Sequence, residues 1–246
     1  MQSKEPKVNI AIKAARLAAK EIHKFARRMD KVKIYEKGPT DFVTNSDIKV
    51  EKIIIEELKK ARPNYSFITE ENGNIKNKDQ NNKWVIDPID GTVNFLHGVP
   101  HFAISIALQS NNEIVSGVIY DPIKDEIFFA EKNNGAFFNN HRIRVSKKNR
   151  INECLFVTSG KLDNQYELPI RKTGCAALDL AYVASGRYDG FFQKNLNLWD
   201  IAAGLILIQE AGGLIYKIDL KKTKNIKVIA SNLDIISKFK EKIPNF

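Results

Sequence analysis

Residues 84–95 read Trp-Val-Ile-Asp-Pro-Ile-Asp-Gly-Thr-Val-Asn-Phe, and this stretch says more about the fold than any other part of the chain. Its first three residues form a short apolar run, which indicates the end of a buried strand. Pro88 lacks the N–H that a strand ladder requires, so we expect the strand to stop after Asp87. Asp90 follows three residues after Asp87, and a bent loop can therefore turn both carboxylates toward one point.

The next two residues of this stretch suit an anion. Gly91 lets the backbone approach a ligand closely, and Thr92 can begin a helix whose first N–H groups bind phosphate. Two carboxylates beside an anion site require divalent cations, and oxygen ligands favour magnesium or manganese over zinc. An Asp-Gly hairpin turn would leave Asp87 and Thr92 unexplained. A calcium loop fits poorly, because its third ligand position and its terminal Glu are missing.

The segment Asp87-Pro88-Ile89-Asp90-Gly91-Thr92-x-Asn94-Phe95 resembles the signature of the inositol monophosphatase family of metal-dependent phosphatases. Three further segments are similar to motifs of that family: residues 38–47 (Gly-Pro-Thr-Asp-Phe-Val-Thr-Asn-Ser-Asp), 67–71 (Phe-Ile-Thr-Glu-Glu) and 199–204 (Trp-Asp-Ile-Ala-Ala-Gly). They occur in the family's order and span most of the chain. The resemblance implies an α+β fold, the layered α/β/α/β/α sandwich of the sugar-phosphatase superfamily, and usually a homodimer.

The resemblance also implies a magnesium-dependent phosphomonoesterase that lithium inhibits, with two or three metal ions and with manganese as a substitute. Phosphate monoesters hydrolyse very slowly in water, and two ions about 3.5–4 Å apart can activate water and stabilise the leaving oxygen. The implied ligands of the first ion are Glu70, Asp87, Asp90, the carbonyl of Ile89 and the hydroxyl of Thr92. Those of the second ion are Asp87, Asp90 and Asp200, while Glu70 would reach a third ion through water.

By the same resemblance, Asp47, Thr92 and Glu70 are the catalytic residues, with Asp47 and Thr92 orienting the attacking water. Asp47 also has a structural interpretation. With Thr44 it has the spacing of a capping box, and an acid in the first turn of a helix stabilises it by about 0.3–1 kcal/mol. Both roles can hold together.

The resemblance assigns the substrate to the N–H groups of Gly91 and Thr92, to the backbone of Cys175 and Ala176, and to Asp90, Gln193 and Asp200. Inositol phosphatases typically carry Glu where this chain has Gln193, and a neutral amide loses the stronger charge-assisted hydrogen bonds. The connection over residues 159–171 also looks short. We expect a small phosphorylated metabolite, with inositol 1-phosphate the leading substrate; histidinol phosphate, a sugar bisphosphate and adenosine 3′,5′-bisphosphate remain open.

Composition narrows the class of protein. The 246 residues are 43% apolar, and no run approaches the roughly 20 apolar residues that a membrane span requires. The two cysteines form no disulfide framework, so we expect a cytoplasmic protein. The net charge of +10 leaves a non-enzymatic, nucleic-acid-associated protein as the alternative from another class. The basic residues are scattered along the chain, which favours a solvated surface over a nucleic-acid site.

Apolar spacing predicts a first helix over residues 8–29 and a second from Thr44 to just before Pro63. A strand over 65–68 and a polar loop over 72–83 come next. An antiparallel meander follows, with strands at 102–108, 114–120, 127–131, 136–138 and 143–145. Beyond residue 150 a strand at 155–158 and helices at 176–185 and 199–211 are expected. We therefore place a soft boundary there, between halves 1–150 and 151–246 that share one cleft.

Overall fold

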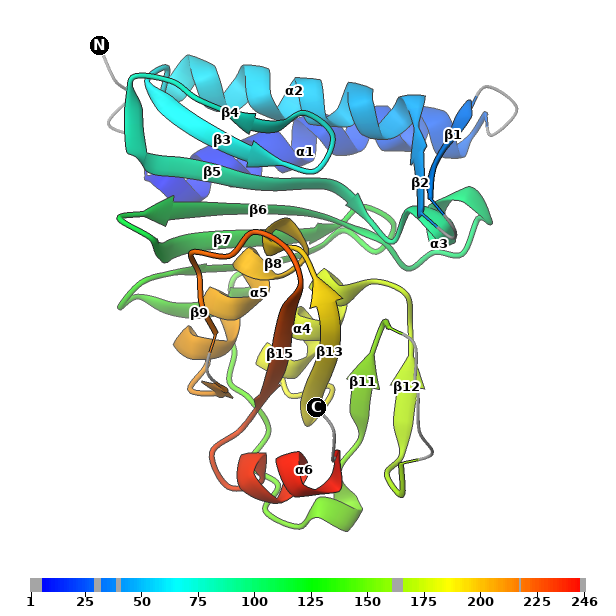
Figure 1. Ribbon diagram of the computed structural model, residues 1–246, viewed down its shortest axis with the longest axis vertical. Coiled ribbons are helices and arrows are strands. Elements are labelled where there is room, and N and C mark those ends of the chain that lie inside the picture. The colour runs from blue at the N-terminus through cyan, green and yellow to red at the C-terminus, as the bar shows by residue number, and fades with distance from the viewer. Residues whose placement is uncertain (1–5, 29–31, 39–40, 161–165, 217, 244–246) are drawn as a thin grey trace.

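The computed structural model describes residues 6–28, 32–38, 41–160, 166–216 and 218–243. The fold is α+β, and its helices and sheets alternate in five layers (Figure 1). The predicted layered sandwich is therefore confirmed. The elements of the first part of the chain are α1 (Lys7–Ala26), β1 (Ile34–Gly38), β2 (Asp41–Thr44), α2 (Asn45–Ala61), β3 (Tyr65–Thr69), β4 (Gly73–Ile75), β5 (Asp79–Asp90), α3 (Thr92–Leu96), β6 (Ala103–Ser110), β7 (Glu113–Asp121), β8 (Glu126–Glu131), β9 (Gly135–Phe138) and β10 (His141–Arg142).

The later elements are η2 (Ile151–Glu153), β11 (Phe156–Thr158), β12 (Ile170–Lys172), α4 (Ala176–Ala184), β13 (Gly190–Leu196), α5 (Leu198–Glu210), β14 (Leu214–Ile215), β15 (Ile226–Ser231) and α6 (Ile236–Lys242). An eight-stranded sheet has the order β10-β9-β8-β7-β6-β5-β3-β4, and a five-stranded sheet has the order β12-β11-β13-β15-β14. Helices α1 and α2 cover the outer face of the larger sheet, and α4 and α5 lie between the sheets (Figure 1). The C-terminal helix α6 packs on the smaller sheet.

The apolar run at residues 84–86 is continuous because both faces of β5 are covered. Trp84 and Ile86 pack against the layer of α1 and α2, and Val85 faces the layer of α4 and α5. A strand buried on both faces gains from apolar side chains at every position rather than at alternate ones. The two outer helices bury one stripe each, as their apolar spacing predicts, although α1 ends at Ala26 rather than near residue 29.

The meander is confirmed for β6 to β9, whose neighbouring strands pair antiparallel. The Asn134-Gly135 turn links β8 and β9, and Gly135 has the positive φ of +88° that a hairpin turn can require. Strand β5 pairs antiparallel with β6 on one side and parallel with β3 on the other, so the larger sheet is mixed. The strand expected at 143–145 is wrong, because the meander ends with β10 at residues 141–142.

Two further predictions near the central strand are wrong. The segment 72–83 is not a loop, since it contains β4 and the beginning of β5. Pro88 also does not end the strand: Asp87 lies opposite Ser105 and Asp90 lies opposite Ala103, three steps on β5 against two on β6. The extra residue forms a bulge, which is one of the few places where a strand tolerates proline.

The chain leaves the larger sheet at Arg142 and enters the smaller sheet at Phe156, so residue 150 lies within the connection between the two sheets. The core is nevertheless shared, because Val85 and Ala107 of the larger sheet belong to the same buried cluster as Phe191 of the smaller one. A boundary at residue 150 therefore stays a prediction. In the parts of the chain described here, no helix is both long and apolar enough to cross a membrane.

The middle layer depends on a glycine within the Trp-Asp-Ile-Ala-Ala-Gly motif. A Cβ added at Gly204 on α5 would lie 2.5 Å from the Cβ of Leu180 on α4. That atom is fixed to the backbone of its helix, so the contact is relieved only if the two helices move apart.

We predict that Gly204→Ala lowers the melting temperature, even though alanine is favoured over glycine within a helix by about 1 kcal/mol. Overpacking of this kind typically costs about 1–3 kcal/mol. Thermal unfolding measures the difference, with Gln209→Ala at an exposed position of α5 as the control. A melting temperature at or above the parent's would show that α4 and α5 can separate without cost.

Candidate active site

A pocket of about 190 Å³ lies where the bulge of β5 meets the second half of the chain. Its lining combines residues that follow β3, residues of β5 and α3, and residues from beyond position 150. The lining residues are Glu70, Asp87, Ile89, Asp90, Gly91, Thr92, Ser159, Gly174, Ala176, Gln193, Leu196 and Asp200. The pocket therefore brings together every residue that the resemblance implies as a metal ligand. Of the other implied site residues, only Asp47 and Cys175 are not part of the lining.

Ser105 connects the strand that carries Asp87 to the helix that carries Asp200. Ser105 on β6 is the cross-strand partner of Asp87, and its Oγ donates to the carbonyl of Trp199 at 3.2 Å. Trp199 directly precedes Asp200, so this bond fixes the start of α5 beside the bulge of β5. Asp200 Oδ2 accepts the N–H of Asn197 at 2.8 Å in the capping box of α5. The acid of the C-terminal motif is thus also a helix cap.

Asp90 is held by the second half of the chain. Its Oδ2 accepts the N–H of Ala177 at 2.5 Å and the thiol of Cys175 at 3.2 Å. Cys175 is not part of the pocket lining: its side chain is fully buried and its N–H lies 3.4 Å from Thr173 Oγ1, so its backbone contact with substrate stays a prediction. Its neighbour Ala176 does line the pocket.

The carboxylates repel one another strongly. Burial raises the pKa of Asp87 well above its usual range, and the nearby charges of Glu70, Asp90 and Asp200 raise it further. Burial also raises the pKa of Asp90 to about 6, although the hydrogen bonds from Ala177, Cys175 and Gly91 oppose the rise. Asp90 keeps some exposed area, but protein atoms surround its carboxylate, and the raised pKa reflects that enclosure.

Asp47 contacts both the first turn of α2 and the hydroxyl of the pocket residue Thr92. Its Oδ2 accepts the N–H of Thr44 at 2.9 Å and completes the predicted capping box of α2. Its Oδ1 lies 3.4 Å from the hydroxyl of Thr92, which also lies 3.0 Å from the carbonyl of Ile89. Asp47 is fully buried, so it acts on the pocket through Thr92. The neighbouring first-loop residues 39 and 40 lie outside the described residues.

A glycine is required where β5 meets α3. Gly91 has a φ of +93°, and an added Cβ would lie 3.1 Å from the carbonyl oxygen of His101 and 3.2 Å from that of Gly174. Asn94 fastens the same junction, because its Nδ2 donates to the carbonyls of His101 at 2.7 Å and Thr173 at 2.9 Å. The Gly91 backbone can therefore face the pocket closely, as the motif predicts.

Ser159 and Gln193 form another part of the pocket lining. The Oε1 atom of Gln193 accepts the N–H of Ser159 at 2.9 Å. This hydrogen bond fixes the orientation of the Gln193 side-chain amide. The described part of the connection from 159 to 171 contains no helix before β12 begins at Ile170.

Two buried acids of the site were missed in the sequence. Glu51 on α2 accepts the N–H groups of Glu71 and Asn72 at 3.0 and 3.1 Å, so it anchors the turn that follows Glu70. Asp179 on α4 accepts the hydroxyls of Ser159 and Thr173. The sequence did offer a signal for each. Glu51 is an acid on the buried stripe of α2, and Asp179 is the one charged residue in the otherwise apolar helix α4.

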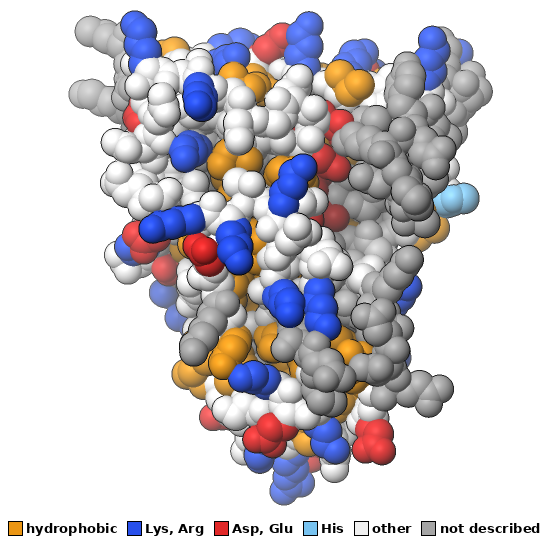
Figure 2. All heavy atoms as spheres, in the orientation of Figure 1, with side chains coloured by type: hydrophobic (Ala, Val, Ile, Leu, Met, Phe, Trp, Pro, Cys, Tyr) orange, Lys and Arg blue, Asp and Glu red, His pale blue; other side chains and the backbone are white. Residues whose placement is uncertain are grey.

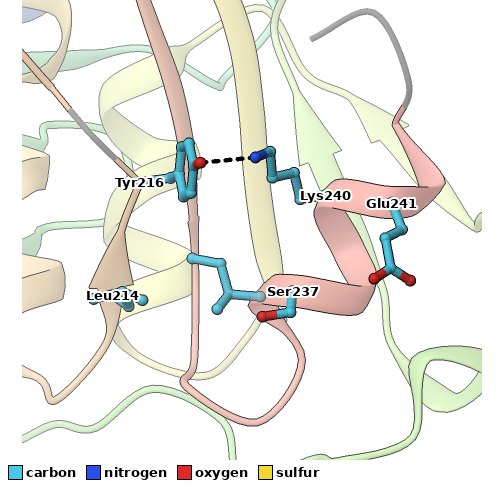
Figure 3. Close-up of a pocket in the computed structure, with 6 residues that line it drawn as sticks. Leu214, Tyr216, Ser237, Lys240 and Glu241 are labelled. Carbon is cyan, nitrogen blue, oxygen red and sulfur yellow. Dashed lines mark hydrogen bonds between the residues drawn. The ribbon is translucent and has the colours of Figure 1, made fainter.

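A second hollow, of about 410 Å³, lies between β14 and α6 (Figure 3). The hydroxyl of Tyr216 accepts a hydrogen bond from Lys240 Nζ at 2.7 Å, and Glu241 is the single carboxylate of the lining. The other lining residues are Leu214, Ile236 and Ser237. This hollow lacks the clustered acids of the first pocket, so it offers no comparable phosphate chemistry.

The donor set of the acidic pocket fits a hard divalent cation. Four carboxylates and a backbone carbonyl supply oxygen alone, which magnesium prefers, and a divalent cation would relieve the mutual repulsion at Asp87. Over the described ranges, no three Asp, Glu, His or Cys side chains already form a closed metal-binding group.

Comparison with known proteins agrees with this site. The sequence profile of the inositol monophosphatase family matches residues 3–243. Inositol-1-monophosphatase of Caulobacter vibrioides is 40% identical, over 94% of this chain and 98% of its own. Nus factor SuhB of Haemophilus influenzae is also 40% identical, over 97% of this chain and 96% of its own. The crystal structure of extragenic suppressor protein suhB from Bartonella henselae superposes with a TM-score of 0.88, at 40% identity and with coverage of 96% and 98%.

Fold, pocket and comparisons together define a phosphoric monoester hydrolase. The chain belongs to the inositol monophosphatase family. The resemblance carried by the four sequence motifs is therefore confirmed. The family is metal-dependent, generally on magnesium, and acts on small phosphorylated substrates.

We predict that magnesium raises the melting temperature, because binding to the folded state alone shifts the unfolding equilibrium by mass action. At about 100 times the dissociation constant the gain is about 2.7 kcal/mol. A thermal-unfolding titration against magnesium chloride measures it, with potassium chloride at matched ionic strength as the control. Identical curves in the two salts would contradict a magnesium site among these acids.

Proposed function

We propose that this protein hydrolyses a small phosphorylated alcohol in a magnesium-dependent reaction, with inositol 1-phosphate as the leading substrate. The observation that carries the proposal is the convergence of four carboxylates on one oxygen-lined pocket. The name of the Caulobacter relative favours the same substrate. A pocket of about 190 Å³ suits a compact ligand better than a macromolecule.

In this proposal Glu70, Asp87, Asp90, Asp200 and the carbonyl of Ile89 would hold magnesium, with manganese as a substitute and two or three ions in all. When bound, the cations supply an activated water and neutralise the charge of the phosphate. The protein contributes the positions of these oxygens. Asp87 Oδ1 accepts the N–H of Ile89 at 3.0 Å, and this bond fixes the bulge that presents both groups.

Asp47 and Thr92 would orient the attacking water and accept its proton in stages. The Thr92 hydroxyl lies at the edge of the pocket, and Asp47 lies behind it at 3.4 Å. A buried carboxylate in this position can receive hydrogen-bond donation from the threonine, which in turn accepts from water. The N–H groups of Gly91 and Thr92 would bind the phosphate oxygens. No covalent phosphoenzyme is required.

The alcohol part of the substrate would lie against Ala176 and Gln193, with Asp90 and Asp200 also within reach of its hydroxyls. Histidinol phosphate, a sugar bisphosphate and adenosine 3′,5′-bisphosphate are the other substrates to compare. On the face drawn in Figure 2, lysine and arginine side chains are spread out rather than gathered in one patch, and we do not extend the proposal to nucleic acid. A homodimer, a cytoplasmic location and lithium inhibition stay predictions.

We predict that Asp90→Asn abolishes magnesium-dependent phosphate release, meaning that the rate falls at least a hundredfold. The substitution removes a charge that two ions would share, and it leaves the N–H of Ala177 with a weaker acceptor. Release of inorganic phosphate from inositol 1-phosphate is the measurement. Glu71→Gln is the matched control, since its side chain is not part of the pocket lining. Activity of Asp90→Asn within a few-fold of the parent would refute the assignment of Asp90.

We predict that Gln193→Glu improves kcat/KM on inositol 1-phosphate by a few-fold at most. One carboxylate oxygen can keep the bond from the Ser159 N–H, now at 2.9 Å, and the other can accept a substrate hydroxyl. Charge-assisted bonds contribute about 1.5–3 kcal/mol in gross terms, and desolvation of the new carboxylate offsets part of that. A sugar bisphosphate should be hydrolysed less well, because the new charge repels its second phosphate.

Steady-state kinetics of Gln193→Glu on both substrates separate these effects. Gln193→Ala serves as the control, because it removes the side chain without adding charge. Equal changes on the two substrates would show that residue 193 does not act on the alcohol part of the substrate.

A further inference from the structure

Asp179 is a buried charge that the reaction proposed above does not use. It is the one charged residue of α4, and its side chain has no exposed area. Its two oxygens accept two hydroxyls: Ser159 Oγ donates to Oδ2 at 2.5 Å, and Thr173 Oγ1 donates to Oδ1 at 2.7 Å. Both of its carboxylate oxygens are therefore committed to neighbouring side chains rather than to the pocket.

These two hydroxyls belong to separate segments of the pocket wall. Ser159 follows β11, lines the pocket, and donates its N–H to Gln193 at 2.9 Å. Thr173 follows β12 and precedes Gly174, another lining residue. The carbonyl of Thr173 accepts Nδ2 of Asn94 at 2.9 Å, which connects this segment to α3. One carboxylate thus ties together the segments that carry Ser159, Gly174 and, through Ser159, Gln193.

We propose that Asp179 is a positioning residue, which fixes the wall formed by Ser159 and Gly174 and so sets the affinity for the alcohol part of the substrate. Asp179 itself does not touch the substrate. The inference rests on the proposed function, since it concerns the same pocket. It assigns selectivity for the alcohol to a residue beneath the pocket.

The electrostatics of Asp179 support a role beyond stability. Burial raises the pKa of Asp179 to about 8, and the charge of Asp90 contributes, while the hydroxyls of Ser159 and Thr173 oppose the rise. The other titratable groups facing it are Cys175 and Tyr188, whose own pKa values are raised with its charge as one cause. A folded-state pKa above the unfolded one favours folding most below about pH 4.

That contribution is lost progressively as the pH rises from about 4 to about 8. At pH 8.5 the ionised side chain thus destabilises the fold relative to a neutral group of the same shape. An asparagine at position 179 would remove this cost, because it is never charged. Its amide, however, has a single accepting oxygen and an NH2 group that only donates, so one of the two hydroxyls would have to change from donor to acceptor and both ties would weaken.

The test is Asp179→Asn, assayed on the full-length protein with magnesium. We expect KM for inositol 1-phosphate to rise five- to tenfold, kcat to stay within twofold, and the inhibition constant of inorganic phosphate to stay unchanged. Inorganic phosphate lacks the alcohol part, so its binding should not depend on how this wall holds the alcohol. The melting temperature at pH 8.5 should equal or exceed the parent's, a result that a purely structural carboxylate would not produce.

Asp189→Asn is the matched control. Asp189 is also a buried aspartate of the second half, but it pairs with Lys148 at 2.8 Å and accepts the N–H of Leu155 at 2.7 Å. The side chain lies just before β13, whereas the pocket residues Gln193 and Leu196 lie further along that strand. We expect this variant to lower the melting temperature and to leave KM unchanged. Equal KM changes in the two variants would overturn the proposal.

A double-mutant cycle with Ser159→Ala tests the route of the effect. If Asp179 acts in part through Ser159, Asp179→Asn should raise KM by a smaller factor in the Ser159→Ala background than in the parent, because only the contact with Thr173 is left to change. Fully multiplicative effects of the two substitutions would overturn the proposal, because they would show that no part of the effect of Asp179 passes through Ser159. Ser159→Ala also keeps the test available if Asp179→Asn does not fold.

Hydrogen exchange gives a readout that does not depend on activity. In Asp179→Asn we expect faster amide exchange in peptides covering 156–160 and 170–177, with the rest of the chain unchanged. Unchanged exchange in both peptides would overturn the inference even for an inactive protein. If the parent releases no phosphate from any monoester, the proposed function fails instead, and hydrogen exchange still decides the role of Asp179.

Discussion

Repulsion among the buried carboxylates of one pocket is the constraint on which the rest of this structure depends. Burial and the negative charges of Glu70, Asp90 and Asp200 all raise the pKa of Asp87. Such an arrangement is unfavourable unless each acid is held by bonds of its own. Asp87 accepts a backbone N–H in the bulge, and Asp200 caps α5. The helix starts and the strand irregularity around the pocket are therefore the means by which the acids are kept close together.

The two halves of the chain meet through the same groups that form the site. Asp90 accepts the Ala177 N–H, Ser105 donates to the Trp199 carbonyl, and Asn94 donates to the Thr173 carbonyl. Each of these bonds joins a residue before position 150 to one after it. Catalytic geometry and the interface between the two sheets are thus specified by one set of hydrogen bonds, and a change in either should alter the other.

Much of this could be predicted from the sequence, because the relevant signals are local. The periodicity of α1 and α2, the Asn134-Gly135 turn and the acids of the Asp87–Phe95 motif each depend on a few neighbouring residues. The parallel pairing of β3 with β5 and the passage of β5 through Pro88 depend on distant strands instead. Asp179 escaped notice for the same reason, since its partners Ser159 and Thr173 come from other segments.

The hydrogen bonds of Asp90 also have a consequence for the order in which the protein is made. The N–H that Asp90 accepts belongs to Ala177, 87 residues further along the chain, and Asp200 follows later still. A ribosome that has released only the larger sheet has therefore released Glu70, Asp87 and Asp90 before the groups that hold Asp90. Their repulsion opposes closure of the bulge until the second sheet emerges. The capacity to bind a cation should consequently arise late in translation, in one step with the folding of the C-terminal half.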